Sequence, residues 1–410
     1  MNGALSGGPQ ETLAARVLGV SVLVYFALHA FRPGLTGIAN TALVLAALAG
    51  IWTLARSPGS VAQLRGPVLA AWLGFVVVAA ISLTQAPPEI VSAGAREFGT
   101  RVAKGTLGGM LLALWLDDAR KARLVLLAAV LASAVITGYF VVSTVRGVTG
   151  GVLPFQRDYA FYLMPFLPFV LAYAVSGARF RWLALALALV PLAISVGFGF
   201  RGGLLAYAVI VMFFAPQLNV RRLIVPTVLL LALTLAAVYV VAPGRFAYVV
   251  MKFQQADLGD RVYQVWLPAL DMFLRHPWLG NGFGHAVYTY QYELLRPEFP
   301  LWNRPTAGSP HNIWLEVAFT TGVAGLAVFA LFALSYVVQS VRNARALAVL
   351  PKNEPMRLLA TALLASFVGS YLVLSFFESP NWTTLALLAG LVQGVTAVTA
   401  RTLAAEDPKA

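Results

Sequence analysis

The sequence predicts an all-α polytopic membrane protein, in which residues 1–410 form a single helical bundle with about twelve transmembrane helices. Of its 410 residues, 60% are hydrophobic and only 11% are charged, whereas about 25% of the residues in a soluble domain are charged. Apolar runs of about 17 residues or more recur along nearly the whole chain, and each is long enough to cross roughly 30 Å of hydrocarbon. Cysteine is absent, which excludes disulfides, thiol catalysis and cysteine-based metal sites.

Hydropathy in windows of about 19 residues gives the approximate limits of these spans. They are 15–31, 35–55, 67–85, 100–116, 124–142, 159–176, 182–198, 201–215, 222–242, 312–339, 358–377 and 383–401. The first is predicted to be a retained span rather than a cleaved signal, and the seventh and eighth are close enough to form one tight hairpin. In the last span, "GLVQG" (Gly390 to Gly394) carries the small residues that let two helices approach closely.

Basic residues in the short connectors predict the orientation of the bundle. They lie at Arg56 and Arg65, in "DDARKAR" (117–123), in "GARFR" (177–181), in "NVRR" (219–222) and between Arg342 and Arg357. Short connectors rich in Lys and Arg face the cytoplasm, so with an even number of spans both termini are expected there. This distribution accounts for the formal net charge of +13 without a nucleic-acid partner, which would need a basic face on a soluble module.

One long connection, residues 243–310, joins the ninth and tenth spans on the outer side. Its segment "DRVYQVWLPALDMFLRHP" (260–277) has polar or helix-breaking residues at 261, 264, 268, 271 and 275, a spacing typical of one face of a helix. The apolar residues of the segment lie mostly away from that face. We therefore expect a surface helix that lies on the outer leaflet, with a kink at Pro268.

Arg201 lies in the glycine-rich turn "SVGFGFRGGLLAY" (195–207), between two apolar runs. A guanidinium this close to hydrocarbon is costly, by about 2.5 kcal/mol or more at the membrane centre. Two interpretations fit the residues. The side chain either snorkels to the interface, or it binds an anion, because its planar fork matches phosphate oxygens and glycines let the backbone approach a ligand.

His311 belongs to the stretch "SPHNIWLEVAFTTGVAGL" (309–326), which begins polar and becomes an apolar helix. Ser309 is predicted to cap this helix with Pro310 at its first position, so that His311 lies in the first turn on the outer side. The positive end of a helix disfavours imidazolium, and a neutral imidazole can accept a proton, although a lone histidine is more often structural. Asn312 and Glu316 are four residues apart on one face, so Asn312 is a candidate partner for that carboxylate.

Other polar residues on the outer side are less informative. Arg261 follows Asp260, a candidate helix cap, and would point from a helix N-terminus that attracts anions. The alternative is that Arg261 is an ordinary surface charge.

Further outer basic residues, including Arg101, are expected to be solvated or paired with lipid headgroups. "GNGFG" (280–284) lacks the spacing of a nucleotide loop and predicts a tight turn. The outer side carries no HExxH, EF-hand or DxD motif and no paired His/carboxylate cluster, so no metal site is expected.

Three of these segments, in this order, resemble the signatures of the bacterial O-antigen ligase and polymerase superfamily. They are "FRGGLLAY" around Arg201, "DRVYQVWLPALDMFLRHPWLGNGFG" from Asp260 and "SPHNIWLEVAFTTGVAGL" from Ser309. The resemblance covers roughly residues 190–335, while the first six spans agree in hydropathy only. Within the superfamily, the short C-terminus and the modest size of the other outer loops favour the lipopolysaccharide ligases.

The resemblance implies a GT-C-like glycosyltransferase of the bacterial inner membrane that needs neither metal nor cofactor and whose active site faces the periplasm. Such ligases transfer the O-antigen glycan from undecaprenyl diphosphate to a sugar of the lipid A core, with inversion at the anomeric carbon. By the same resemblance, Arg201 and Arg261 would stabilise the diphosphate and His311 would accept the proton of the attacking hydroxyl. Arg157 and Asn312 are candidates for additional substrate contacts.

Two alternative functions stay open at this point. An O-antigen polymerase, or a related transferase of lipid-linked oligosaccharides, would use similar residues on two lipid diphosphates. A transporter or flippase would be expected to show broken helices or paired halves with charges at the midplane, whereas the notable charges here gather at the outer side.

The absence of cysteine allows a direct test of orientation. A Gly308→Cys variant should be labelled by a membrane-impermeant thiol reagent from the periplasmic side of intact cells, because residue 308 precedes the tenth span on the outer side. Labelling only after the cytoplasmic side is exposed would contradict the predicted topology.

Overall fold

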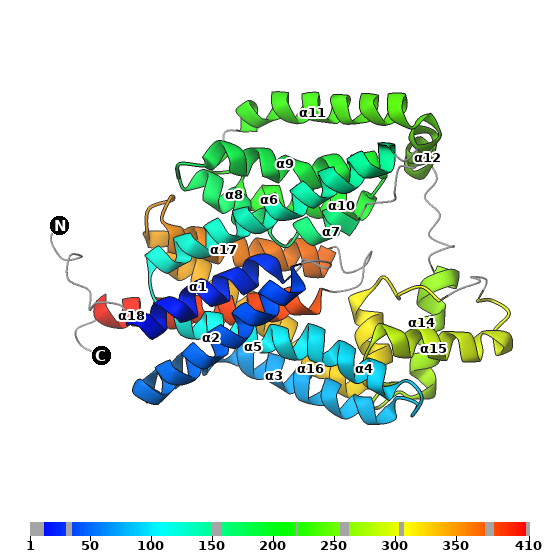
Figure 1. The fold of residues 1–410 in the computed structure, drawn as a ribbon, viewed down its shortest axis with the longest axis horizontal. Helices are drawn as coiled ribbons and strands as arrows, with labels where there is room; N and C mark the ends of the chain where they lie inside the picture. Colours follow the sequence, from blue (N-terminus) through cyan, green and yellow to red (C-terminus); the bar gives the residue numbers. More distant parts are fainter. Residues whose placement is uncertain are drawn as a thin grey trace.

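The computed structural model describes residues 12–29, 35–149, 158–218, 220–254, 262–302, 307–373 and 381–406. All regular secondary structure in these residues is helical (Figure 1), which confirms the predicted all-α class. Six of the helices are long and apolar enough to cross a membrane. They are α2 (Thr36–Arg56), α3 (Pro67–Ser82) continued by the 3-10 turn η2 (Leu83–Gln85), α6 (Ala119–Thr149), α16 (Ile313–Ala346) continued by the 3-10 turn η6 (Leu347–Val349), α17 (Pro355–Phe367) continued by the π-helical turn η7 (Val368–Val373), and α18 (Trp382–Glu406).

Shorter apolar helices complete the bundle. They are α1 (Leu13–Leu28), α9 (Arg181–Gly197), α10 (Arg201–Phe214) and the part Thr227–Val241 of α11 (Val220–Val241). α9 and α10 are joined by a short turn, as predicted for the seventh and eighth spans. The chain is therefore a membrane protein with several spanning helices, and the count of about twelve stays a prediction.

Two predicted spans are interrupted. The region predicted as 159–176 is divided into α7 (Asp158–Leu163) and α8 (Leu167–Val175). Pro165 lies in the break, where its ring cannot donate a helical hydrogen bond. The region predicted as 100–116 is divided between the π-helical turn η3 (Gly99–Ala103) and α5 (Lys104–Trp115), and the separate helix α4 (Val91–Phe98) precedes it.

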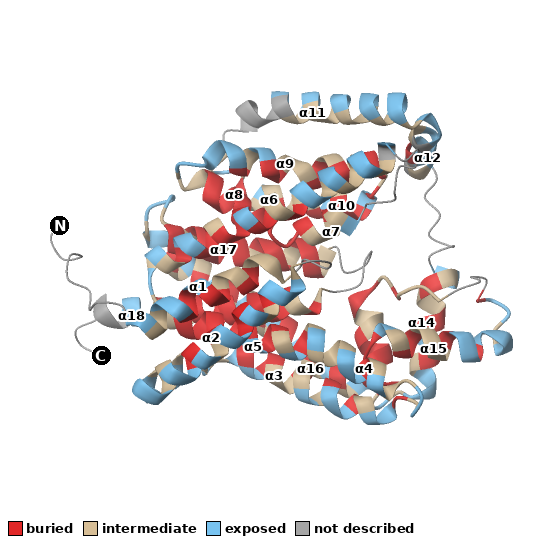
Figure 2. Cartoon of the chain, viewed as in Figure 1, coloured by how far each residue is buried: buried red, intermediate tan, exposed pale blue. Residues whose placement is uncertain are grey.

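Small residues allow the central helices to pack closely. A Cβ atom at Gly390 of α18 would overlap the backbone of Gly109 in α5, which confirms the close helix contact predicted from "GLVQG". The core beside this contact is aromatic: Trp382 stacks on Phe75 of α3 with ring centroids 5.4 Å apart. The buried residues concentrate along the middle of the molecule, whereas α2 and α11 expose much of their surface (Figure 2).

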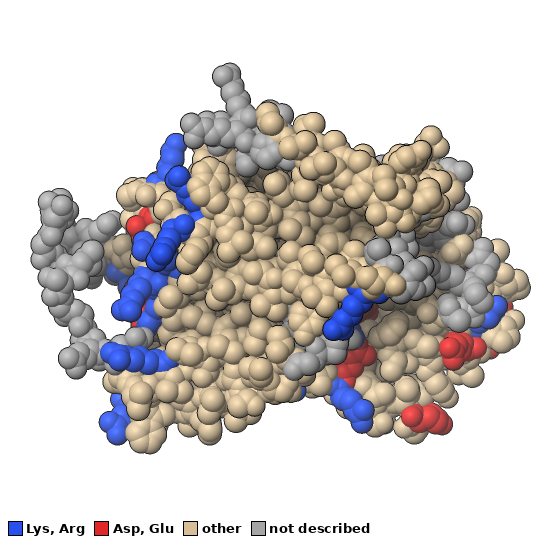
Figure 3. Space-filling view, turned by 45° about the horizontal axis from the view of Figure 1, so that its top comes forward, with Lys and Arg blue, Asp and Glu red and all other residues tan. Residues whose placement is uncertain are grey.

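The exposed surface of the outer helices is apolar. It includes Leu48 and Ile51 of α2 and Leu229 and Leu233 of α11, each more than half exposed. Lys and Arg gather at the end of the molecule where α1 begins and α18 ends, whereas the opposite end carries both acidic and basic residues (Figures 1 and 3). The face between these ends is almost free of charge in Figure 3, as expected for a surface covered by lipid.

The connection predicted as a long outer loop is largely helical in its described residues. It contains α12 (Pro243–Gln254), the π-helical turn η4 (Val262–Trp266), α14 (Leu267–Arg275), α15 (His285–Leu295) and the short 3-10 helix η5 (Arg296–Glu298). α14 and α15 lie at the end of the molecule away from the termini (Figure 1).

The predicted polar face of the 260–277 segment is wrong. The buried residues are Val265, Pro268, Ala269 and Met272, so Pro268 lies on the packed side and Leu270, predicted to point away from the polar face, is 40% exposed. The reason is tertiary: α14 packs against α16 and α15, so its neighbours in the protein determine which side is covered. Pro268 occupies the second position of α14, directly after the π-helical turn, where its missing N–H costs little.

α16 is broken near its start, and the Pro277–Gly284 turn fits into the break. Gly322 has a φ of 66°, inside an otherwise helical run. The N–H of Val323 donates to the carbonyl of Pro277 (2.7 Å), and the N–H of Asn281 donates to the carbonyl of Phe319 (2.8 Å). The turn predicted from "GNGFG" is confirmed, since Gly280, Gly282 and Gly284 all have positive φ.

We expect Gly322→Ala to lower the thermal stability of the purified protein. A Cβ at position 322 would overlap the backbone of Trp278, and positive φ in a non-glycine residue costs on the order of 1–3 kcal/mol. Gly138→Ala is the matched control, because a Cβ at this helical position meets no atom within 4 Å and alanine favours a helix by up to about 1 kcal/mol. Equal melting temperatures for Gly322→Ala and the wild type would refute the importance of this break.

Candidate functional site

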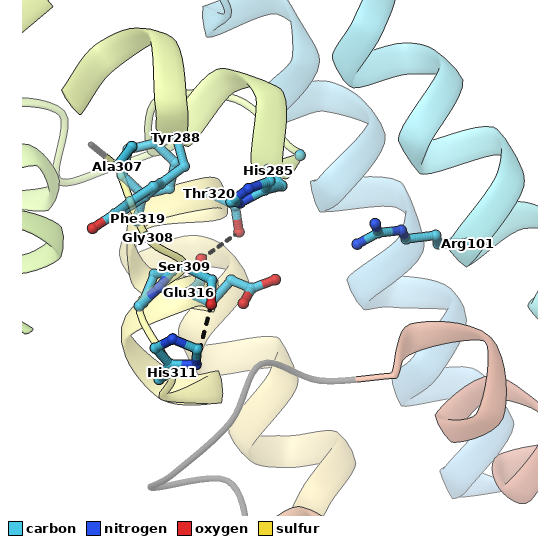
Figure 4. A pocket seen from close by; sticks show the side chains of 12 residues that line it. Arg101, His285, Tyr288, Ala307, Gly308, Ser309, His311, Glu316, Phe319 and Thr320 are labelled. Carbon is cyan, nitrogen blue, oxygen red and sulfur yellow. Dashed lines mark hydrogen bonds between the residues drawn. The ribbon is translucent and has the colours of Figure 1, made fainter. Parts of the chain in front are cut away.

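A cavity of about 290 Å³ lies where α15, the start of α16 and the π-helical turn η3 meet. Figure 4 shows its side chains. It is lined by Arg101, Gly284, His285, Tyr288, Ala307, Gly308, Ser309, Pro310, His311, Glu316, Phe319 and Thr320. The cavity therefore combines residues that are more than 200 positions apart in the sequence.

His311 lies on the cavity wall in an unusual backbone conformation. Its φ is 46°, and no other non-glycine residue in the described part of the chain has a positive φ. Such residues are uncommon and often mark functional positions. The ring is half-buried, and its Nδ1 lies 3.3 Å from Oγ of Ser309, a contact that helps to orient the imidazole.

The predicted start of this helix is wrong. α16 begins at Ile313, and Asn312 rather than Ser309 is the N-cap. The side-chain oxygen of Asn312 accepts hydrogen bonds from the N–H groups of Trp314 (2.9 Å) and Leu315 (3.2 Å). An Asx cap satisfies two of the free helical donors, so the helix starts later and His311 precedes it. The role of Asn312 in substrate binding stays a prediction.

Glu316 reaches the cavity from the first turns of α16. Its Oε1 accepts a hydrogen bond from the indole Nε1 of Trp382 at 3.3 Å. Trp382 begins α18 and is almost completely buried. The sequence could not identify this partner, because the two residues are 66 positions apart and belong to different helices.

Arg101 and Glu97 connect the cavity to α15, and sequence reasoning missed them. The two side chains form an ion pair one helical turn apart, and Oε2 of Glu97 accepts a hydrogen bond from the backbone N–H of His285 at 2.7 Å. This carboxylate thereby caps the N-terminus of α15. The four-residue spacing of Glu97 and Arg101 was the available signal, but the contact with α15 depends on the fold.

The second imidazole of the cavity, His285, is kept neutral by its surroundings. Although its side chain is accessible from the cavity, the neighbouring protein atoms displace water, and this desolvation lowers the pKa of His285. Glu97 opposes that change, whereas Arg101 and His311 add to it. His285 and His311 are therefore close enough to interact electrostatically.

The remaining predicted site residues lie outside this cavity or outside the described residues. Arg201 is the exposed first residue of α10 and is not among the residues that line the cavity. The neighbouring Gly199 has a φ of 64° and packs against Lys252 of α12, so this turn lies beside α12 (Figure 1). Arg157 and Arg261 lie outside the described residues. Within the described ranges, no group of three or more His, Asp or Glu residues could hold a metal ion.

Comparison with known proteins relates this arrangement to one family. A family model described as O-antigen ligase matches residues 164–330, which include Arg201, His311 and Glu316. The O-antigen ligase of Salmonella typhimurium strain LT2 is 25% identical over 391 residues, which is 88% of this chain and 91% of the Salmonella protein. The O-antigen ligase of Pseudomonas aeruginosa strain PAO1 is 34% identical over 74 residues, 18% of this chain and 16% of that protein.

The Salmonella match extends beyond the region of the family model to nearly the whole chain, so the similarity concerns the bundle as well as the histidine-bearing helix. The chain is similar to the O-antigen ligases, most specifically over the residues that the family model matches.

Proposed function

We propose that this chain transfers an O-antigen glycan from undecaprenyl diphosphate to a sugar of the lipid A core. The observation that carries the proposal is the cavity that brings His311 and Glu316 together with His285 at one end of a membrane bundle. A reaction between two lipid-borne substrates needs a polar site at a membrane surface, and this cavity lies at the end of the molecule opposite the termini. Similarity to the O-antigen ligases supports the same class of reaction.

The reaction takes place on the periplasmic face of the inner membrane. This orientation is supported by the Lys and Arg residues that gather at the end where both termini lie (Figure 3), since short basic connectors face the cytoplasm. The cavity end carries acidic and basic residues together with α14 and α15 (Figures 1 and 3). Both glycolipid substrates then reach the cavity from the outer leaflet.

The chemistry is a single displacement at the anomeric carbon of the donor. The oxygen of an acceptor hydroxyl forms the new glycosidic bond while the bond between the anomeric carbon and the diphosphate breaks, so the configuration inverts. His311 accepts the hydroxyl proton as general base, and Ser309 orients its ring. Glu316 lies beside it and can accept a hydrogen bond from a sugar hydroxyl.

The leaving group is a diphosphate, which needs stabilisation of charge more than protonation. Arg201 and Arg261 supply that stabilisation through charge-assisted hydrogen bonds, and Arg157 and Asn312 add substrate contacts. Two guanidinium groups neutralise the diphosphate, so the reaction requires no metal ion. The named relatives favour a ligase over a polymerase, because both are O-antigen ligases.

Purified protein should join a lipid-diphosphate glycan to lipid A–core in the presence of excess EDTA, and His311→Gln should reduce this transfer by roughly 100-fold or more. The glutamine keeps a hydrogen-bonding group but cannot take a proton. The measurement is the rate of glycan transfer at several pH values. His276→Gln is the matched control, because His276 is exposed and does not line the cavity.

Three results would contradict this proposal. If wild-type protein transfers no glycan, or transfers it only with added Mg²⁺ or Mn²⁺, the assigned reaction or its metal independence is wrong. If His311→Gln keeps most of the wild-type rate with the same pH profile, His311 only positions the acceptor.

Arg201→Lys and Arg261→Ala should each impair transfer while the protein still folds. Lysine keeps the charge at position 201 but loses the planar fork, and alanine at position 261 removes up to about 3 kcal/mol of transition-state stabilisation if the contact is charge-assisted. The measurement is kcat/KM for the lipid-diphosphate donor, with thermal unfolding as a check on folding. Near wild-type values in both variants would remove these arginines from the diphosphate site.

A further inference from the structure

The two walls of the cavity differ in chemistry. α16 contributes His311 and Glu316 to one wall, and the π-helical turn η3 contributes Arg101 to the wall that faces them (Figure 4). Among the described residues that line the cavity, Arg101 is the only Arg or Lys. A ligand in the cavity therefore meets a permanent positive charge on one side and a base with a carboxylate on the other.

Arg101 is held in place at both its backbone and its side chain. Its carbonyl oxygen accepts a hydrogen bond from Oγ1 of Thr383 at 2.8 Å, which ties the π-helical turn to α18. Its guanidinium pairs with Glu97, whose other oxygen caps α15. About one third of the side chain stays accessible (33%), compared with 14% for Glu97. A guanidinium has five N–H donors, so it can bind this carboxylate and a phosphate at the same time.

We propose that Arg101 binds the diphosphate of the lipid-linked donor inside the His311 cavity. The inference rests on the proposed function and extends it, since sequence analysis expected Arg101 only in contact with solvent or lipid headgroups. It assigns an isoprenyl diphosphate to the η3 wall of the cavity. π-helical turns are frequent at functional sites, which is consistent with this place for an anion ligand.

The arrangement of charges selects the diphosphate over a phosphate of the acceptor. A single displacement needs the nucleophile and the leaving group on opposite sides of the anomeric carbon. The base, His311, fixes the nucleophile at the α16 wall, where the carboxylate of Glu316 accepts hydroxyl groups and repels phosphates. The leaving diphosphate then lies at the opposite wall, where Arg101 stabilises the charge that develops as the bond breaks.

The test is diphosphate binding and transfer by the purified full-length protein. Farnesyl diphosphate serves as a soluble isoprenyl diphosphate probe. Arg101→Gln should raise its Kd and the KM of the donor by roughly 10- to 100-fold, the loss of one charge-assisted hydrogen bond, and should leave the KM of lipid A–core unchanged. Arg101→Lys should fall between Arg101→Gln and the wild type. Arg96→Gln is the matched control, because Arg96 is an exposed residue of α4 that does not line the cavity.

A second variant separates binding from a merely structural role. If Arg101 only neutralises Glu97, the double variant Glu97→Gln/Arg101→Gln should recover wild-type affinity, because glutamine can still accept the hydrogen bond from His285. If Arg101 binds the diphosphate, the double variant should be as defective as Arg101→Gln. Should Arg101→Gln fail to fold, as judged by thermal unfolding, Arg101→Lys and the double variant decide between these outcomes.

Three results would overturn the inference: a wild-type Kd for the probe in Arg101→Gln, recovery of affinity in the double variant, or a rise in the KM of the acceptor without a rise in that of the donor. The last result would assign Arg101 to a phosphate of the acceptor. Binding of the probe does not depend on catalysis. Protein that binds it through Arg101 but transfers no glycan would disprove the proposed function and leave the diphosphate site intact.

Discussion

The candidate site depends on one backbone contact, the insertion of the Pro277–Gly284 turn into the break of α16 at Gly322. At the break, backbone groups of α16 find hydrogen-bond partners in the turn instead of in their own helix. The N–H of Val323 donates to the carbonyl of Pro277, and the carbonyl of Phe319 accepts from the N–H of Asn281. Unpaired backbone groups inside a membrane protein cost several kcal/mol each, so the break and the turn stabilise each other. Because His285 follows the turn directly and His311 precedes the same helix, this contact fixes the distance between the two imidazole-bearing segments.

α18 then positions the polar groups of both cavity walls. Its first residue, Trp382, donates to Glu316, and the next residue, Thr383, donates to the carbonyl of Arg101. The close packing of Gly109 on Gly390 holds the same helix against α5, which continues from the π-helical turn. A single buried helix thus sets the separation between a carboxylate and a guanidinium that would otherwise attract each other across the cavity. A site with groups fixed in advance loses little free energy to reorganisation when charge moves during the reaction.

The sequence predicted the features that depend on local chemistry. The all-α class, the tight turn at 280–284 and the close contact at Gly390 follow from hydropathy and from glycine, whose effects act within a few residues. The sequence-based predictions were wrong or incomplete where contacts between distant segments determine the structure. The covered face of α14 is set by α16, and the partner of Glu316 comes from α18. The cap of α16 is Asn312 rather than Ser309, because His311 between them has a non-helical φ of 46°. The sequence drew attention to His311 through its place at an apolar helix and through the family resemblance, and its role stays a prediction. Arg101 was not predicted to bind a ligand, because its contacts with Glu97 and Thr383 and the link from Glu97 to α15 depend on the packing of α15 and α18 against η3.

The placement of charged groups in the cavity is consistent with the proposed reaction, in which negative charge increases on the leaving diphosphate while the acceptor loses a proton. Before transfer, the negative charge of the donor is already on the diphosphate, and it increases as the anomeric bond breaks. In the proposed reaction, a proton leaves the acceptor at the opposite wall, which His311 and Glu316 line. Desolvation keeps His285 neutral, which leaves it able to donate or accept a hydrogen bond without adding a second charge near Arg101. In the proposed reaction, the guanidinium of Arg101, paired with Glu97, lies on the leaving-group side, and positive charge appears on the other side only as His311 accepts the proton.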